Sequence, residues 1–185
     1  MVTQKVRKVV IVGGGTAGWL AAASVSKLLG KNLDISLIES DEIGTVGVGE
    51  ATIPTMITLH QLLKIDEREF MAAVQGTFKL GISFENWKDV GKDYIHSFGF
   101  TGKDCWAAGF VHFWLKAKKQ GFGADFGEYC TELMAAKANK FAVYKPDGLN
   151  YAYHMDASLY AKFMRKIAEQ HGAKRIEGKV VEVGT

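Results

Sequence analysis

The first forty residues alternate between short apolar runs and one longer amphipathic stretch. Residues 8–12 form a β-branched run that stops at three glycines, which is typical of a buried parallel strand. Residues 16–29 have the composition of a helix, and Gly30 follows as a C-terminal glycine. Residues 33–39 alternate apolar and polar side chains, which predicts a second strand. The segment as a whole therefore predicts a β-α-β unit with a right-handed crossover.

Further along the chain, the pattern predicts one strong amphipathic helix and several weaker elements. The strong helix covers residues 156–171 and is followed by a third strand over residues 174–183. The weaker predictions are helices over 54–63, 66–75, 110–120 and 128–138 and a strand over 77–87, while residues 88–108 show no clear period. The order of elements predicts an α/β fold. Because doubly wound sheets usually have five or six strands, we expect this sequence to be the front part of a larger protein.

Composition and charge exclude several classes of protein. The 185 residues are 48% hydrophobic, which is enough for a core and excludes global disorder. A net charge of +3 with scattered basic residues argues against a nucleic-acid partner. The two cysteines predict no disulfide framework, so we expect a reducing, cytoplasmic location. Glycines interrupt the apolar N-terminal stretch, which argues against a signal peptide, and no stretch has membrane-spanning length.

The strongest chemical signal is the motif Gly13-x-Gly15-x-x-Gly18, which lies between the first strand and the first helix. Gly13 permits a tight turn, Gly15 lets the backbone approach a pyrophosphate, and Gly18 allows the helix to pack closely on the strand. The helix N-terminus then faces the phosphates. Glu39 ends the next strand, where its carboxylate can accept a hydrogen bond from a ribose 2′-hydroxyl. This context predicts dinucleotide binding, and the motif alone does not separate FAD from NAD.

Three other features leave a functional and a structural interpretation open. The glycines of Gly47-Val48-Gly49-Glu50-Ala51 either let the backbone approach a flat cofactor or only form a turn. Lys79 lies in an apolar strand-like segment, where the pattern favours a solvated strand face over a lysine held in a pocket. The aromatic segment 94–100 either stacks on a flat substrate or covers a small core. The histidines have no partner at ligand spacing, so we expect no metal site.

Taken together, these segments resemble the flavin-dependent tryptophan halogenase family over essentially the whole chain. The resemblance begins at residues 10–19, where Thr-Ala-Gly-Trp is narrower than a general glycine fingerprint. It continues through 47–54, 67–71, 78–87, 94–99, 112–115 and 154–157. It implies a Rossmann-like FAD-binding domain of the flavin monooxygenase and halogenase type. We expect residues 1–54 and 172–185 to form the dinucleotide-binding sheet, and residues 55–171 to form a helical and irregular substrate-side insertion.

The resemblance implies halogenation of tryptophan or a related electron-rich aromatic. A separate flavin reductase supplies FADH2 by diffusion, and oxygen and chloride or bromide give hypohalous acid. Lys79 then hydrogen-bonds this oxidant or forms a haloamine, while His96 and Phe98 hold the indole. The residues that match FAD contacts are Gly13, Gly15, Thr16, Ala17, Gly18, Glu39, Gly47, Val48, Gly49, Ala51 and Val181. The resemblance is compatible with a homodimer and implies no membrane or nucleic-acid partner.

The sequence also departs from the family pattern. The Trp-x-Trp-x-Ile-Pro signature, the second flavin and halide segment, and the glutamate that cooperates with the lysine are all absent. We therefore expect this chain alone to be inactive as a halogenase. Two alternatives remain open, which are another FAD-dependent monooxygenase and a non-catalytic, truncated FAD-binding module.

Overall fold

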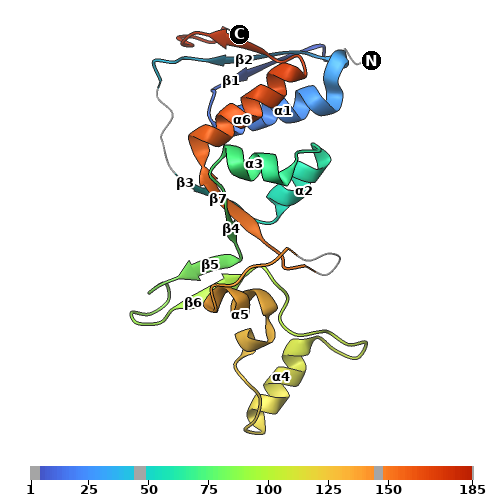
Figure 1. Ribbon diagram of the computed structural model, residues 1–185, viewed down its shortest axis with the longest axis vertical. Coiled ribbons are helices and arrows are strands. Elements are labelled where there is room, and N and C mark those ends of the chain that lie inside the picture. The colour runs from blue at the N-terminus through green and yellow to red at the C-terminus, as the bar shows by residue number, and fades with distance from the viewer. Residues whose placement is uncertain (1–4, 44–48, 144–147, 185) are drawn as a thin grey trace. The chain divides into compact units, whose positions relative to one another are not determined.

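A computed structural model describes residues 5–43, 49–143 and 148–184 (Figure 1). The chain divides into two compact units. Unit 1 contains residues 1–51, 57–77 and 154–185, and unit 2 contains residues 52–56 and 78–153. The boundary between the units falls within strands β4 (Thr77–Lys79) and β7 (Ala152–Asp156).

Unit 1 is built on a parallel sheet with the strand order β1-β2-β8. β1 (Lys8–Val12) pairs with β2 (Asp34–Glu39), which pairs in turn with β8 (Lys174–Glu177). Two helices, α1 (Thr16–Leu29) and α6 (Ala157–Gln170), lie side by side on one face of this sheet (Figure 1). Together these elements bury the apolar side of β2, where Ile35 and Leu37 are almost fully enclosed.

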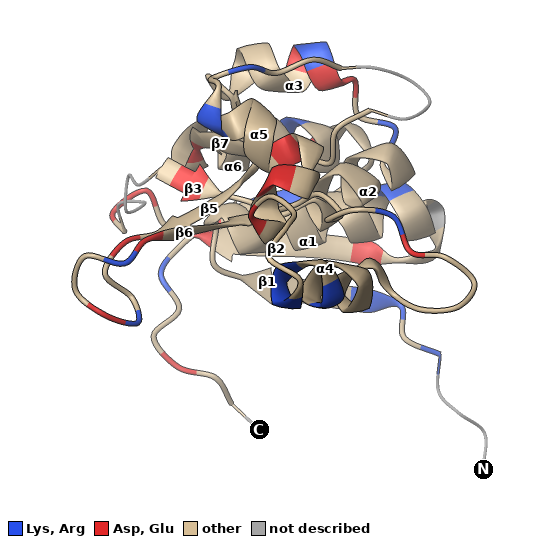
Figure 2. Cartoon of the chain, turned by 90° about the horizontal axis from the view of Figure 1, so that it is seen from below, with Lys and Arg blue, Asp and Glu red and all other residues tan. Residues whose placement is uncertain are grey.

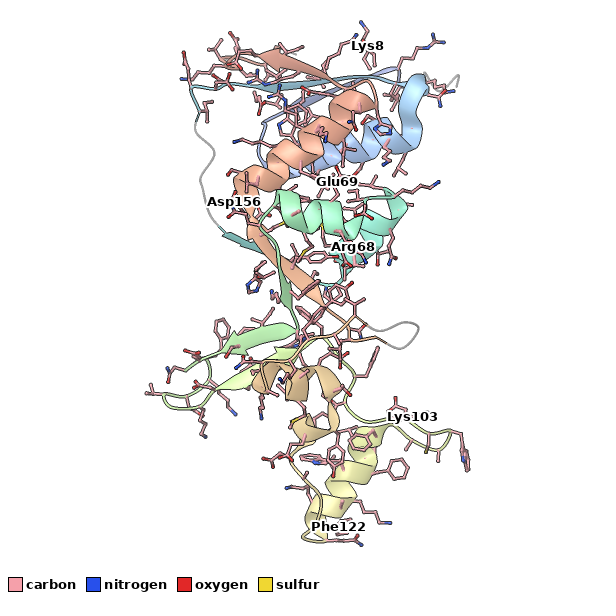
Figure 3. The ribbon with its side chains drawn as sticks, viewed as in Figure 1. Lys8, Arg68, Glu69, Lys103, Phe122 and Asp156 are labelled. Atoms are coloured by element: carbon pink, nitrogen blue, oxygen red, sulfur yellow. The ribbon has the colours of Figure 1, made fainter. Side chains whose placement is uncertain are left out.

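The remaining elements of unit 1 form a second layer next to α6. These are α2 (Thr55–Leu62), of which residues 57–62 belong to this unit, α3 (Glu67–Ala73) and β3 (Gly49–Ala51), which pairs antiparallel with β7. Asp156, labelled in Figure 3, ends β7 and caps α6, because its carboxylate accepts a hydrogen bond from the Leu159 backbone N–H at 2.8 Å. The rings of His60 from α2, Phe70 from α3 and Tyr160 from α6 pack against one another, with centroids 4.5 to 5.8 Å apart.

Unit 2 contains the antiparallel hairpin of β5 (Gly81–Phe84) and β6 (Tyr94–Ser97), with α5 (Thr131–Lys137) packed against it. The 3-10 turn Phe126–Tyr129 precedes α5. Helix α4 (Phe110–Lys119) has no fully buried residue. The lysines of its last turns are the blue stretches of α4 in Figure 2, and they complement the negative end of the helix dipole. A ring cluster of Phe78, Phe141, Tyr151 and Tyr153 completes this unit.

The structure confirms the strands and helices that the pattern predicted most strongly. α1 has the predicted bounds, and the strands near 8–12, 33–39 and 174 form one parallel sheet. The third strand is shorter than predicted, because it ends at Glu177. The prediction that the first strand is buried is wrong for one face, since Val10 and Val12 are about 60% exposed among the described residues. The helices α1 and α6 cover only the other face of the sheet.

Three strands were not predicted. The aromatic segment 94–97 is a strand of a hairpin and not a loop, since Ile82 pairs with His96 and Phe84 pairs with Tyr94. The predicted strand over residues 77–87 is divided into two short strands, β4 and β5. Strand β3 has only three residues, and the five residues of β7 do not alternate regularly between buried and exposed, so the sequence pattern does not reveal either strand.

Candidate functional site

The glycine motif has the geometry that its predicted roles require. Gly13 adopts a φ of +107°, and its N–H donates to the Ile38 carbonyl at 2.9 Å. A Cβ on Gly18 would lie 1.9 Å from the Gly13 carbonyl oxygen, so only glycine lets the helix approach the turn this closely. A Cβ on Gly15 would meet no atom within 4 Å. The N-terminus of α1 therefore faces open space at Gly15.

A cavity of about 390 Å³ lies at the carboxyl ends of the parallel strands in unit 1. This is the edge at which open α/β sheets bind their ligands. The cavity brings together three of the predicted cofactor-binding residues, Gly13, Gly15 and Glu39, and Gly178 and Val180 line it as well. Thr16, Ala17 and Gly18 continue into α1 and do not line the cavity, and Val181 is 90% exposed beside it.

The carboxylate of Glu39 is held by three side chains of unit 1. The Arg175 Nε donates to Oε1 at 2.6 Å, and the Trp19 indole N–H donates to Oε2 at 3.2 Å. The Arg165 guanidinium forms a longer ion pair with Oε1 at 3.7 Å. A Cβ on Gly14 would lie 1.4 Å from Oε2, so this glycine makes room for the carboxylate. The sequence analysis missed Gly14 and the two arginines as neighbours of Glu39.

The second glycine segment lies only partly within the described residues. Gly47 and Val48 fall outside them, whereas Gly49 and Ala51 are in β3. Gly49 and Ala51 line a different hollow of unit 1, of about 380 Å³, together with Glu50, His154 and Asp156. The structure therefore does not bring Gly49 and Ala51 to the cavity at the Gly13 turn.

Lys79 is buried and not solvated, which corrects the interpretation that the pattern favours. It ends β4 and is 8% exposed. Its Nζ donates a hydrogen bond to the Thr52 carbonyl at 3.0 Å and lies 5.4 Å from the centre of the Phe98 ring. Burial lowers the pKa of the Lys79 ammonium below its ordinary value. The alternation of side chains along β4 does not reveal the burial of Lys79, because Phe78, on the predicted apolar side, is 40% exposed.

Phe98 and His96 both come from the β6 end of the hairpin in unit 2. The Phe98 N–H donates to the Leu80 carbonyl at 2.9 Å, which fixes the backbone of Phe98 next to the Lys79 segment. His96 is exposed and lines a cavity of about 840 Å³ with Ser97, Gly99, Phe126 and Leu133, a cavity that Phe98 does not line. The structure therefore brings Phe98 next to Lys79, whereas His96 lines a cavity that neither of these residues lines.

A buried polar chain supports the end of β6, and the sequence analysis missed it. The Ser97 hydroxyl lies 3.0 Å from the Cys130 sulfur, which lies 3.7 Å from the Glu132 carboxylate. Glu132 is 6% exposed, and it accepts a hydrogen bond from the Asn150 backbone N–H at 2.8 Å. A Cβ on Gly99 would lie 1.7 Å from Glu132 Oε2. A single glutamate in an amphipathic segment has no sequence signal that separates it from a solvated one.

His60 is a buried histidine with structural surroundings. His60 is 4% exposed, and its Nε2 lies 2.9 Å from the Tyr160 hydroxyl. Burial lowers the pKa of His60 to about 4 and raises the pKa of Tyr160. No group of three or more metal-ligating side chains occurs within residues 5–43, 49–143 and 148–184. Over the same ranges, no helix has the length and apolar character that a membrane span requires.

Comparison with solved structures gives close matches over nearly the whole chain. Xcc4156, a flavin-dependent halogenase from Xanthomonas campestris, is 62% identical with a TM-score of 0.94, and the match covers 98% of this chain and 37% of that one. BrvH, a flavin-dependent halogenase from Brevundimonas sp. BAL3, is 38% identical with a TM-score of 0.87, and the match covers 97% of this chain and 37% of that one.

Comparison with curated proteins leads to the same family. Tryptophan 7-halogenase RebH from Lentzea aerocolonigenes is 35% identical over 97% of this chain, which spans 37% of that relative. Tryptophan 6-halogenase SttH from Streptomyces toxytricini is 31% identical over 99% of this chain, which spans 39% of that relative. The chain thus spans about two fifths of the length of these relatives. The sequence profile of tryptophan halogenases matches residues 8–185, and this chain belongs to the flavin-dependent tryptophan halogenase family.

Proposed function

We propose that this chain carries the FAD-binding turn and the directing lysine of a flavin-dependent halogenase. The substrate is tryptophan or a related indole, and the halogen comes from chloride or bromide. The observation that carries the proposal is the buried Lys79, whose Nζ is hydrogen-bonded to the Thr52 carbonyl and lies beside the Phe98 ring. The proposal concerns the complete protein, because the chain spans about two fifths of its curated relatives.

The cavity at the Gly13 turn fits the adenosine diphosphate part of FAD. The backbone at Gly15 is open to a pyrophosphate, and the 14-residue helix α1 presents its N-terminus there. Glu39 lines the same cavity and supplies a carboxylate acceptor for the ribose. When bound, reduced FAD would supply the electrons that activate oxygen, and the activated oxygen would oxidise halide to hypohalous acid, while a separate flavin reductase would supply the reduced form.

Lys79 has the properties that a directing residue for hypohalous acid needs. An ammonium carries three N–H donors, and among the described residues one of them is used on the Thr52 carbonyl. The others can hold a hypohalous acid next to an aromatic carbon. Burial lowers the Lys79 pKa, which also raises the share of neutral amine that could form a haloamine. Phe98 offers a ring face beside Nζ on which a flat indole can pack.

The test is the variant Lys79→Met in the complete enzyme, with FAD, a flavin reductase, oxygen and bromide. We expect loss of halogenated indole or tryptophan in a mass-spectrometric assay while FAD binding stays intact, because methionine fills the space of the lysine stem without its charge. The matched control is Lys88→Met, since Lys88 is exposed in unit 2. Retained halogenation by Lys79→Met would refute the role of Lys79. An oxygenated product without halogen would instead identify a monooxygenase.

A further inference from the structure

The carboxylate of Glu39 is anchored from the side of the sheet, and Arg175 provides its shortest contact. Arg175 is in β8, two residues before the register partner of Glu39, which is Glu177. Its Nε lies 2.6 Å from Glu39 Oε1, and the two side chains are only 16% and 18% exposed. A charge-assisted bond of this length in a mostly enclosed place holds a carboxylate in one orientation. Trp19 fixes the other oxygen at 3.2 Å.

Arg175 is itself held in place by two further carboxylates of unit 1. Its terminal nitrogen donates to Asp41 at 2.5 Å and to Glu177. The Asp41 backbone N–H also donates to Glu177 at 2.9 Å, which ties the end of β8 to the segment after β2. Hydrogen bonding to Glu39, followed by the charges of Asp41 and Glu177, raises the pKa of Arg175. Within the described residues, the ion pairs of this guanidinium therefore all go to carboxylates, and one of them is Glu39.

The Glu39 carboxylate and the arginine that holds it differ in their position relative to the cavity. Glu39 lines the cavity at the Gly13 turn, but Arg175 does not line it. Gly178 does line it, and its N–H donates to the Glu39 carbonyl at 2.9 Å. We therefore expect Arg175 to act on a bound ribose through Glu39.

We propose that Arg175 is the positioning residue that holds the Glu39 carboxylate toward the 2′-hydroxyl of the adenosine ribose. This inference rests on the proposed function, because it assumes that FAD binds in this cavity. Asp41 and Glu177 orient Arg175, and Trp19 completes the support from α1. The residue that contacts the ribose and the residue that orients it thus come from different strands of the sheet.

The experiment compares the binding of ADP and 2′-deoxy-ADP by calorimetry, in the complete enzyme and in its Arg175→Gln and Arg175→Lys variants. The wild type should prefer ADP roughly tenfold, the value of one hydrogen bond to a charged acceptor. In Arg175→Gln, the ratio of the two dissociation constants should fall close to one, because the Glu39 carboxylate loses its shortest hydrogen bond. Arg175→Lys, which keeps the charge without the planar fork, should keep part of the preference. The control Lys174→Gln removes a neighbouring charge whose side chain is 69% exposed and should keep the full preference.

The ratio of the two dissociation constants separates positioning from a structural role. If Arg175 had only a structural role, its replacement would weaken the binding of both nucleotides equally. An unchanged ratio in folded Arg175→Gln and Arg175→Lys would therefore overturn the proposal. Glu39→Gln should lose the preference as well, and a preference that survives in this variant would also overturn it. If the wild-type enzyme binds neither FAD nor ADP, the proposed FAD site itself is wrong. If it binds both nucleotides with equal affinity, only the inference about Glu39 and Arg175 fails.

Discussion

The buried histidine of unit 1 makes the stability of the protein depend on pH. His60 is 4% exposed, is packed edge-on against Phe70 at 4.5 Å, and shares a short contact with the Tyr160 hydroxyl. Burial lowers its pKa from 6.5 to about 4, an effect that the charge of Glu67 only partly offsets. The folded protein therefore keeps His60 neutral at a pH at which the unfolded chain binds a proton.

The direction of the effect follows from proton linkage. Because the unfolded state binds more protons between pH 6.5 and pH 4, the free energy of unfolding falls as the pH falls through this window. The difference between the two pKa values corresponds to about 3 kcal/mol when the pH is well below 4. At pH 5, the protonation of His60 in the unfolded chain lowers the free energy of unfolding by about 2 kcal/mol relative to pH 8.

Urea unfolding of the wild type and of His60→Gln at pH 8 and pH 5 measures this contribution. Glutamine leaves a polar group near the Tyr160 hydroxyl but does not titrate, so the loss of stability between the two pH values should shrink by about 2 kcal/mol. His112→Gln is the control, since His112 is exposed in α4 and should leave the loss unchanged. Equal losses in the wild type and His60→Gln would refute the reasoning, whatever the absolute stability of the variant.

Three further predictions concern the glycine turn and the two cores. Gly15→Ser should fold normally but bind FAD more weakly, whereas Gly18→Ala should lose both stability and FAD binding, because its Cβ would meet the Gly13 carbonyl at 1.9 Å. Fluorescence titration with FAD and thermal unfolding test this pair, and equal FAD affinity in Gly15→Ser and the wild type would contradict it. Glu132→Ala should lower the free energy of unfolding by about 1–3 kcal/mol in urea unfolding, because the buried carboxyl and the hydrogen bond that it accepts from the Asn150 backbone N–H are lost, and Glu132→Gln should cost less. Phe70→Ala should cost about 3–5 kcal/mol in the same assay, since Phe70 is fully buried among aromatic rings, and a loss below 1 kcal/mol would contradict this packing.

The sequence by itself determined the glycine turn and the elements on either side of it. The bounds of α1 and the parallel pairing of β1 with β2 agree with the predicted β-α-β unit. These features are readable because each depends on neighbours within about thirty residues. A β-branched run, a glycine with a positive φ and a helix with regular apolar spacing each leave a local pattern.

The tertiary structure decided which polar side chains are buried and which partners they have. Lys79 looked like a residue of a solvated strand face, but it contacts the Thr52 carbonyl, 27 positions away. Glu39 was predicted at the ribose, but the arginine that holds it is 136 positions further along the chain. Ser97 and Glu132 are linked through Cys130 in the same way. A periodic pattern records which side of an element is apolar, whereas hydrogen bonds between distant charged groups depend on how the elements pack, and this packing is set by the whole chain.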